Sequence, residues 1–450
     1  CMDFRSAILR STKKEETMKK MTLITALVIG AALYAGHFGV GDVIFPMKLG
    51  QESGNSWLPS AIGYIVINSI LALLAYTMIA KTGKNLVETT SDIMGRSFGV
   101  IYGSILMLII GPVFILPRVS SATHEISIMP LFPQIPLFVT LLIFFFLNAY
   151  VCLNPTKVVD RLGKILSPIL IIFIVIVYVK GIVTPISSPI ETGLKLPFFN
   201  GFTYAYNTMN AIGAALFGGW MLIELSRRGI EKENQTWELT KLGILVVIGL
   251  AITAFAEIYV GATTGEVLKG ASLGELPSKI VNLLFGQMGV GILSILIAFA
   301  CFTTSVGLTA AAGHFFEDVT KGKLTYRTLV ILASIVGFIL GNVGLSKIVR
   351  WTVPWLFLTY PALIVIIIFA NLLDWRKFRT VIMGGVIGAI LFSIPDTLIQ
   401  AGLGGKVMPA FVSYLPFGSA GLGWVIPSVV GLVLGGIIHL ISAPKPKPAT

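Results

Sequence analysis

Charged side chains are scarce in this chain, and their scarcity excludes a soluble protein. Only 12% of the 450 residues are Asp, Glu, Lys or Arg, whereas 55% are hydrophobic. Soluble domains carry about 25% charged residues. A bilayer-crossing helix takes about 20 mostly apolar residues. We therefore expect an all-α polytopic membrane protein with twelve transmembrane helices, at 22–48, 57–81, 99–123, 134–152, 164–183, 201–226, 237–263, 280–313, 326–343, 350–372, 378–399 and 421–441.

Cysteine and histidine are also rare, at three and four residues. Cys1, Cys152 and Cys301 form no disulfide framework, and the histidines are too scattered for a metal site. The sequence lacks a phosphate-cradling GxxxxGK[ST], a GxGxxG after a strand and an HExxH. These absences argue against an ATP-driven pump and a metalloenzyme, so we expect no enzyme and no cofactor. The first apolar segment is too long for a signal-peptide core, so we expect no cleavable signal.

The Lys and Arg residues that give the chain its formal charge of +12 are unevenly divided between the two predicted sides of the membrane. Of the 33 Lys and Arg residues, 24 lie in the two tails and in the loops after even-numbered segments, and the other nine lie on the opposite side. The positive-inside rule therefore places both termini in the cytoplasm. Anionic lipid at the cytoplasmic face of the membrane attracts these basic residues. They therefore need no polyanionic partner, and we expect no nucleic acid partner.

Two apolar segments are interrupted by glycine. Gly36, Gly39 and Gly41 interrupt the first segment near its middle, and Gly213–Gly219 interrupts the sixth. Glycine weakens a helix and frees polar backbone, which is tolerated at membrane depth only inside protein or beside a cavity. One glycine-rich patch alone is also explained by close helix packing. Two patches five segments apart instead favour an inverted repeat with a binding site between two discontinuous helices.

This repeat predicts how the chain is divided. We expect two five-helix units related by inversion, with the last two helices outside them. The divisions are a cytoplasmic N-terminal tail at 1–21, a first repeat at 22–183, a second, inverted repeat at 201–372, two further helices at 378–441 and a cytoplasmic C-terminal tail at 442–450.

Asp42 is the most informative ionisable residue. An Asp at the centre of a membrane helix costs about 2.5–3.5 kcal/mol on insertion scales, so its presence calls for a reason. One interpretation is structural, because an acid just after the break caps the outer half-helix. The other is cation coordination or protonation during transport. His37, before the break, either titrates near neutral pH or is a hydrogen-bonded packing residue.

Adjacent hydroxyls occur in the eighth segment at Thr303, Thr304 and Ser305. Such hydroxyls commonly bond back to carbonyls of the preceding turn. Together with carbonyls freed at the first break, they would also suit a hard cation such as sodium.

The third segment combines two prolines with a charge. Pro112 and Pro117 must kink its helix. Arg118 is expected to interact with Glu125 near the outer surface or to snorkel, in a structural or gating role.

Six motifs occur in order along the chain: Gly39–Pro46 (GVGDVIFP), Gly111–Arg118 (GPVFILPR), Tyr206–Asn210 (YNTMN), Phe217–Gly218, Cys301–Leu308 (CFTTSVGL) and Asn342–Ser346 (NVGLS). Together they resemble the bacterial branched-chain amino acid:cation symporters (carrier II, or LIVCS, family). The resemblance runs from the first segment to the tenth and beyond. It implies a LeuT-like fold, which is the five-plus-five arrangement that the breaks suggest independently.

The resemblance also implies an activity and a site. The activity is sodium-coupled import of leucine, isoleucine and valine across the inner membrane by alternating access, with sodium as the coupling ion. The implied sodium ligands are backbone oxygens of Ala35, Phe38 and Ala300 and the hydroxyls of Thr303 and Thr304. The implied substrate site comprises Phe38, amides near Gly39 and Gly41 for the carboxylate, Asp42, carbonyls near Ala215 and Phe217 for the ammonium, and Gly218.

The chain departs from the family pattern at four positions. The family usually has Asn at Asp42 and Asp at Asn210, as if an acid had moved from one broken helix to the other. It also tends to have an apolar or aromatic residue at His37 and an acid at His314. Asp42 beside a substrate carboxylate would be repulsive unless it is protonated or cation-bound. Two alternatives therefore stay open: proton instead of sodium coupling, and a paralogue that carries a different amino acid or an amine.

A channel, a transporter-like receptor and an intramembrane enzyme are competing classes. A receptor normally carries a soluble output domain, for which these short tails leave no room. An enzyme would need a convergent catalytic set, and the sequence shows none.

Overall fold

The computed structural model describes residues 21–154, 157–405 and 407–442. Within these ranges every regular element is helical. Seven helical stretches are long and apolar enough to cross a membrane, or eight when one bent pair is counted as a span, and four shorter apolar helices accompany them. The chain is thus an all-helical multi-pass membrane protein, and the count of twelve spans stays a prediction. Nearly all of the two predicted tails lies outside the described residues.

Most of the α-helices overlap the predicted apolar segments, but the short helices at 86–94 and 407–414 lie between them. In chain order they are α2 (Leu23–His37), α3 (Val40–Ser53), α4 (Trp57–Ile65), α5 (Leu71–Thr82), α6 (Leu86–Met94), α7 (Arg96–Leu108), α8 (Ile115–Ala122), α9 (Leu137–Leu153), α10 (Lys157–Val183), α11 (Pro197–Tyr204), α12 (Asn210–Arg227), α13 (Lys232–Ala262), α14 (Glu275–Val319), α15 (Tyr326–Gly341), α16 (Leu345–Leu372), α17 (Arg379–Gln400), α18 (Val407–Tyr414) and α19 (Val425–Ser442). Short π-helical turns at Val66–Ile70, Ile109–Val113 and Thr123–Ile128 join several of them.

The first apolar segment is broken where its glycines predict. Helix α2 ends at His37 and α3 begins at Val40, and the intervening Phe38 and Gly39 have non-helical backbone. Gly39 is extended, with φ −106° and ψ −179°. The chain therefore turns out of one helix and into another within two residues, which leaves the N-terminal amides of α3 at the break.

The break in the sixth segment lies elsewhere than the glycines predict. Helices α11 and α12 meet at Met209, whose φ of 60° is left-handed, and the pair is bent by 44°. Gly213–Gly219 lies inside the continuous helix α12, so the predicted position was wrong. A Cβ on Gly218 would come within 2.6 Å of Ile79 Cδ1 on α5. This glycine thus serves close helix packing, the alternative weighed from the sequence.

The third segment is kinked, as its prolines predict. Gly111 has non-helical backbone (φ −112°, ψ −123°) in the π-helical turn between α7 and α8, next to Pro112. Arg118 lies beyond this kink, in α8.

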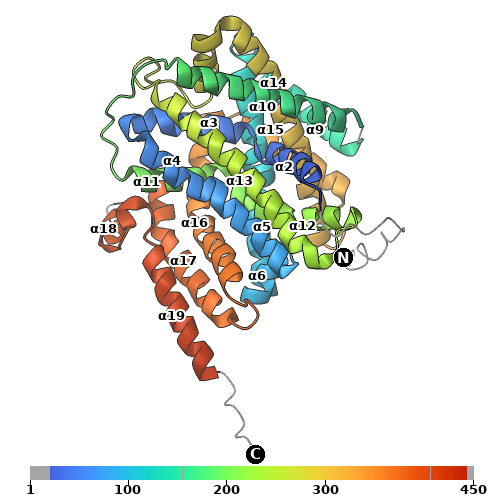
Figure 1. Cartoon of the computed structure of the whole chain (residues 1–450), viewed down its shortest axis with the longest axis vertical. Helices are drawn as coiled ribbons and strands as arrows, with labels where there is room; N and C mark the ends of the chain where they lie inside the picture. Colours follow the sequence, from blue (N-terminus) through green and yellow to red (C-terminus); the bar gives the residue numbers. More distant parts are fainter. Residues whose placement is uncertain (1–20, 155–156, 406, 443–450) are drawn as a thin grey trace, which may run out of the picture.

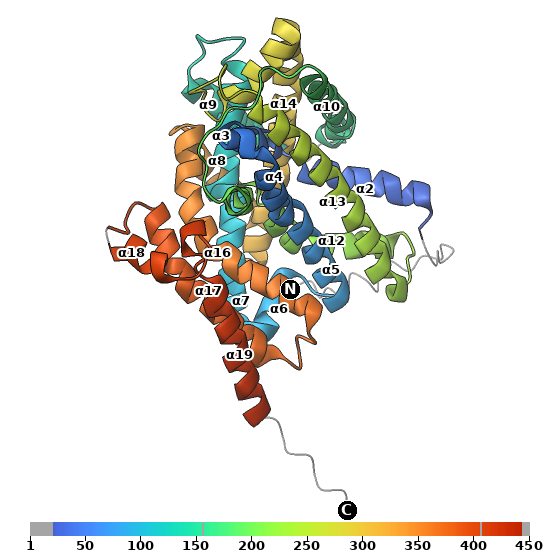
Figure 2. The ribbon, with the colours of Figure 1, turned by 60° about the vertical axis from the view of Figure 1, so that its left-hand side comes forward.

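Helix α13 connects several helices of the bundle. It packs against both halves of the first broken segment, α2 and α3, and against α4 and α5, and Figure 1 shows it running diagonally among them. The contact with α3 is very close, because a Cβ on Gly261 would come within 2.0 Å of the Met47 carbonyl oxygen. Helices α17 and α19 pack on each other at one flank of the molecule (Figure 2).

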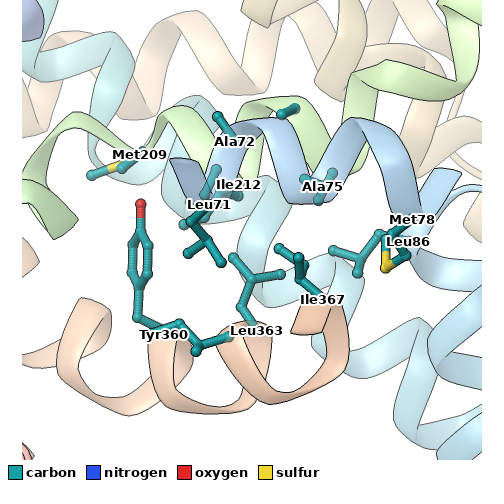
Figure 3. Close-up of a cluster of buried hydrophobic side chains, with 14 of the residues drawn as sticks. Leu71, Ala72, Ala75, Met78, Leu86, Met209, Ile212, Tyr360, Leu363 and Ile367 are labelled. Atoms are coloured by element: carbon teal, nitrogen blue, oxygen red, sulfur yellow. The ribbon is translucent and has the colours of Figure 1, made fainter. Parts of the chain in front are cut away.

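An apolar cluster joins α5, α12 and α16 beside the second break (Figure 3). Leu71, Ile212 and Leu363 are all buried in it. Lipid tails are as apolar as these side chains, so the cluster stabilises the bundle chiefly through close packing. It holds the start of α12 against α5 and so positions Asn210.

Candidate functional site

The two helix breaks meet in a network of buried polar side chains. Asn210, the first residue of α12, donates its amide to Asp42 Oδ1 at 2.7 Å and to Asn68 Oδ1 at 2.9 Å. Its own Oδ1 lies 3.2 Å from Nδ1 of His37, the last residue of α2. The other ring nitrogen of His37 lies 2.6 Å from the Tyr76 hydroxyl. One asparagine thus links both halves of the first segment to the second break.

Asp42 performs the capping role expected of it. Its Oδ2 accepts a hydrogen bond from the Gly39 amide at 3.2 Å, at the N-terminus of α3 where an acid is favourable. Its Oδ1 accepts from Asn210, and the side chain is only 5% exposed. Asp42 and Asn210, two of the four positions singled out in the sequence, therefore contact each other, and the single carboxylate of this pair lies on α3.

Arg118 is a component of the site that the sequence interpretation misplaced. It is 3% exposed, donates through Nη1 to the Asn207 carbonyl at 2.7 Å and lies over the Phe45 ring at 5.1 Å. Its Nη2 is 3.1 Å from the point where a Cβ on Gly41 would stand. The expected snorkelling or pairing with Glu125 is therefore wrong. Glu125 instead accepts the Leu345 amide at 3.0 Å.

A positive charge is thus buried between the two breaks, beside the start of α3. Arg118 Nε has no hydrogen-bond partner among the described residues. A guanidinium with a free N–H beside a helix N-terminus is suited to an anionic group, because both present donors and positive potential to it.

The predicted substrate residues divide into two groups. Phe38, Gly39, Gly41 and Asp42 lie at the first break, as expected, although the Gly39 amide already binds Asp42. Ala215, Phe217 and Gly218 lie about two turns beyond the second break, inside α12. The segment brings Asn207, Thr208, Met209 and Asn210 to the break instead.

The predicted sodium ligands lie on α2, α14 and the first break, and α14 packs against α3. The Thr303 hydroxyl donates to the carbonyls of Phe299 at 3.0 Å and Ala300 at 3.1 Å, which is the back-bonding weighed from the sequence. Thr304 and Ala35 are half-buried and Phe38 is buried. The part of the chain that is described holds no cluster of three or more His, Cys, Asp or Glu residues. Sodium coordination by these five residues stays a prediction.

Asn68 and Tyr76 are site residues that the sequence reasoning missed. Both lie in the second apolar segment, and Asn68 is buried in the π-helical turn Val66–Ile70. A signal for Asn68 was available, because an amide inside an otherwise apolar membrane segment is costly and needs a partner. Tyr76 carried no such signal, since tyrosine is common in membrane helices.

Comparison with known proteins identifies the family of this chain. The family described as "Branched-chain amino acid transport protein" matches residues 22–442. The branched-chain amino acid permease BraB of Bacillus subtilis is 34% identical over 434 residues, covering 93% of this chain and 96% of the relative. The branched-chain amino acid transport system 2 carrier protein of Pseudomonas aeruginosa is 31% identical over 432 residues, covering 94% and 98%.

Solved structures show the same fold at low identity. Mhp1, a nucleobase-cation-symport-1 family transporter, matches with a TM-score of 0.61 at 13% identity, covering 95% of each chain. The manganese transporter of Eremococcus coleocola matches with a TM-score of 0.58 at 16% identity, covering 94% of this chain and 98% of that one. These matches confirm the expected LeuT-like transporter fold.

The family match over nearly the whole chain and the relatives above 30% identity show that this protein belongs to the branched-chain amino acid transport protein family, whose members are transporters and not enzymes.

Proposed function

We propose that this protein is a secondary active symporter that imports leucine, isoleucine and valine, coupled to sodium, across a bacterial plasma membrane with both termini in the cytoplasm. Family membership and the names of the relatives support the branched-chain substrates. The observation that carries the mechanism is the hydrogen bond between Asp42 and Asn210, which ties two helix breaks together. Breaks of this kind form substrate sites in secondary transporters.

The site offers separate places for the two charged groups of an amino acid. The substrate carboxylate binds at the N-terminus of α3, where Arg118 stands beside Gly41 and supplies a full positive charge. This charge offsets the repulsion between the substrate carboxylate and Asp42. The substrate ammonium binds toward Asp42, on the side that faces the interruption at Met209.

The coupling ion binds beside the same break. Carbonyl oxygens of Ala35, Phe38 and Ala300 and hydroxyls of Thr303 and Thr304 would form its shell, because a hard cation prefers oxygen ligands. Thr303 keeps its oxygen lone pairs available while its proton is donated to the preceding turn. Ion binding there favours one arrangement of α2 relative to α3, and this couples the ion to access to the substrate site.

Uptake by purified protein in proteoliposomes tests the proposal. We expect radiolabelled leucine to accumulate when an inward sodium gradient is imposed, and a matched potassium gradient of the same size to give little uptake. Unlabelled isoleucine and valine should compete with leucine. Uptake that ignores both sodium and proton gradients would refute symport.

A second candidate is a transporter of a different amino acid or an amine, with proton or cation coupling. The acid at Asp42 favours it, because Asp42 can pair with a cationic group of the substrate. Competition by a panel of amino acids and amines separates the two candidates. If an amine displaces leucine more strongly than isoleucine does, and Asp42→Asn abolishes that preference, the second candidate holds.

A further inference from the structure

A second buried acid, Glu257, has no role in the site described above. It lies on α13 inside the span Lys232–Ala262 and is 1% exposed. The Tyr178 hydroxyl on α10 donates a hydrogen bond to its Oε1. Its other oxygen, Oε2, is buried and has no hydrogen-bond partner in the described part of the chain, and neither has the Tyr34 hydroxyl.

Among the residues that the structure describes, no positive charge balances Glu257. The ionisable groups that face it from the helices packed on α13 are Tyr34 on α2, Asp42 on α3, Tyr64 on α4 and Tyr178 on α10. Glu257 takes part in none of the ion pairs between described residues. Lys180, two residues beyond Tyr178, donates instead to the Leu284 carbonyl at 2.5 Å.

The other two charged side chains on α3 pair with each other and not with Glu257. Lys48 and Glu52 lie farther along that helix, with 3.9 Å between their charged groups.

An ionised carboxylate buried without a partner is costly, and neutralisation by a proton removes most of that cost. Because Oε1 already accepts the tyrosine proton, a proton bound to Glu257 belongs on Oε2.

Glu257 lies on the part of α13 that packs against both sides of the first break, so its charge affects the helices that form that break. Upstream of it on α13, Gly249 faces the Tyr34 ring of α2, with 2.7 Å between Tyr34 Cδ2 and the point where a Cβ would stand. Downstream, Gly261 faces the Met47 carbonyl of α3 still more closely, with 2.0 Å between the carbonyl oxygen and the point where a Cβ would stand. Glu257 lies between these two contacts, so a change in its charge acts on the helix that supports both halves of the broken segment.

We propose that Glu257 binds a proton that is taken up and released during the transport cycle, at a site distinct from the substrate and sodium sites. On release, the proton leaves Oε2 for water and the carboxylate keeps the hydrogen bond from Tyr178. This inference rests on the proposed symport for its place in the cycle, but the protonation itself does not depend on transport.

Infrared spectroscopy of the purified protein tests protonation directly. At neutral pH we expect a carbonyl band of a neutral carboxylic acid that disappears in Glu257→Gln, whose amide copies the shape of a neutral carboxyl. Tyr178→Phe should shift the band, because it removes the hydrogen bond to Oε1. The band should persist in Asp42→Asn and in Glu238→Gln, a buried acid on the same helix that pairs with Lys241 at 2.9 Å.

Two results would overturn the proposal. One is the absence of a Glu257-dependent band in the wild-type protein. The other is a band that vanishes on addition of saturating sodium but not of matched potassium, which would assign the site to a metal cation.

Transport then tests exchange of the proton. We expect an inward proton gradient to raise sodium-driven leucine uptake by wild-type protein and by Glu238→Gln, and we expect that stimulation to be lost in Glu257→Gln. Equal stimulation of Glu257→Gln refutes proton exchange. If the wild type takes up no leucine under any gradient, the proposed symport fails, while the infrared band still decides the protonation of Glu257.

Discussion

The contact between Asp42 and Asn210 makes a charge-exchange experiment possible. Asn210→Asp would place two carboxylates where oxygen and nitrogen now lie 2.7 Å apart. At that distance two unit charges repel by about 6 kcal/mol at an effective dielectric constant of about 20, which is an upper limit because one group can take up a proton. Asp42→Asn instead removes charge from a hydrogen bond, and such bonds contribute about 1.5–3 kcal/mol.

The double variant Asp42→Asn, Asn210→Asp restores one carboxylate and one amide. It also keeps an acid at a helix N-terminus, because residue 210 begins α12 just as residue 42 lies in the first turn of α3. We therefore expect strong coupling between the two positions, about 3 kcal/mol relative to additive behaviour, at the upper end for residues in contact. That corresponds to leucine uptake by the double variant about a hundredfold above the value expected if the effects of the two single variants simply added.

Initial rates of leucine uptake across a concentration series measure this coupling as a double-mutant cycle. Apparent melting temperatures in detergent serve as the control for folding, and all four proteins should be compared at equal incorporation into liposomes. The reasoning is refuted if Asn210→Asp transports like the wild type, or if the double variant transports no better than the summed effects of the two single variants predict.

Three further predictions concern the surroundings of the site. Arg118→Lys should lower kcat/KM for leucine at least about tenfold, because lysine keeps the charge but loses the planar fork that reaches Asn207 and Gly41; an unchanged value would remove Arg118 from carboxylate binding. Tyr76→Phe should lower apparent stability by about 1 kcal/mol through loss of its bond to His37, whereas Tyr64→Phe should not, since that buried hydroxyl has no partner among the described residues. Gly261→Val should abolish monodisperse expression, because its Cβ would clash with α3, and Gly291→Ala, which has open space, should be tolerated; equal chromatographic profiles would contradict the close α3–α13 contact.

The first broken segment could be predicted from the sequence because its signals are local. Three glycines and an acid within a long apolar run destabilise a helix whatever surrounds it, and the structure breaks the helix at Phe38 and Gly39. The capping role of Asp42 was predictable for the same reason, since a cap and its amide lie within three residues of each other.

The second break could not be located in this way. Glycines at 213, 218 and 219 carry the same local signal, yet they lie inside α12, where Gly218 packs closely on α5. The break falls at Met209, which carries no glycine signal. A glycine therefore marks either a break or a close helix contact, and only the neighbouring helix distinguishes the two.

The sequence by itself determined the membrane class, the apolar segments, the first break and the family resemblance, because hydrophobic runs, glycine clusters and ordered motifs are properties of contiguous residues. Only the tertiary structure decided which polar groups share a partner. It pairs Asp42 with Asn210 across 168 positions and carries Arg118 inward to Asn207, away from the surface where its sequence neighbours placed it. Buried polar groups must be satisfied inside a membrane protein, and the partners that satisfy them are chosen by helix packing.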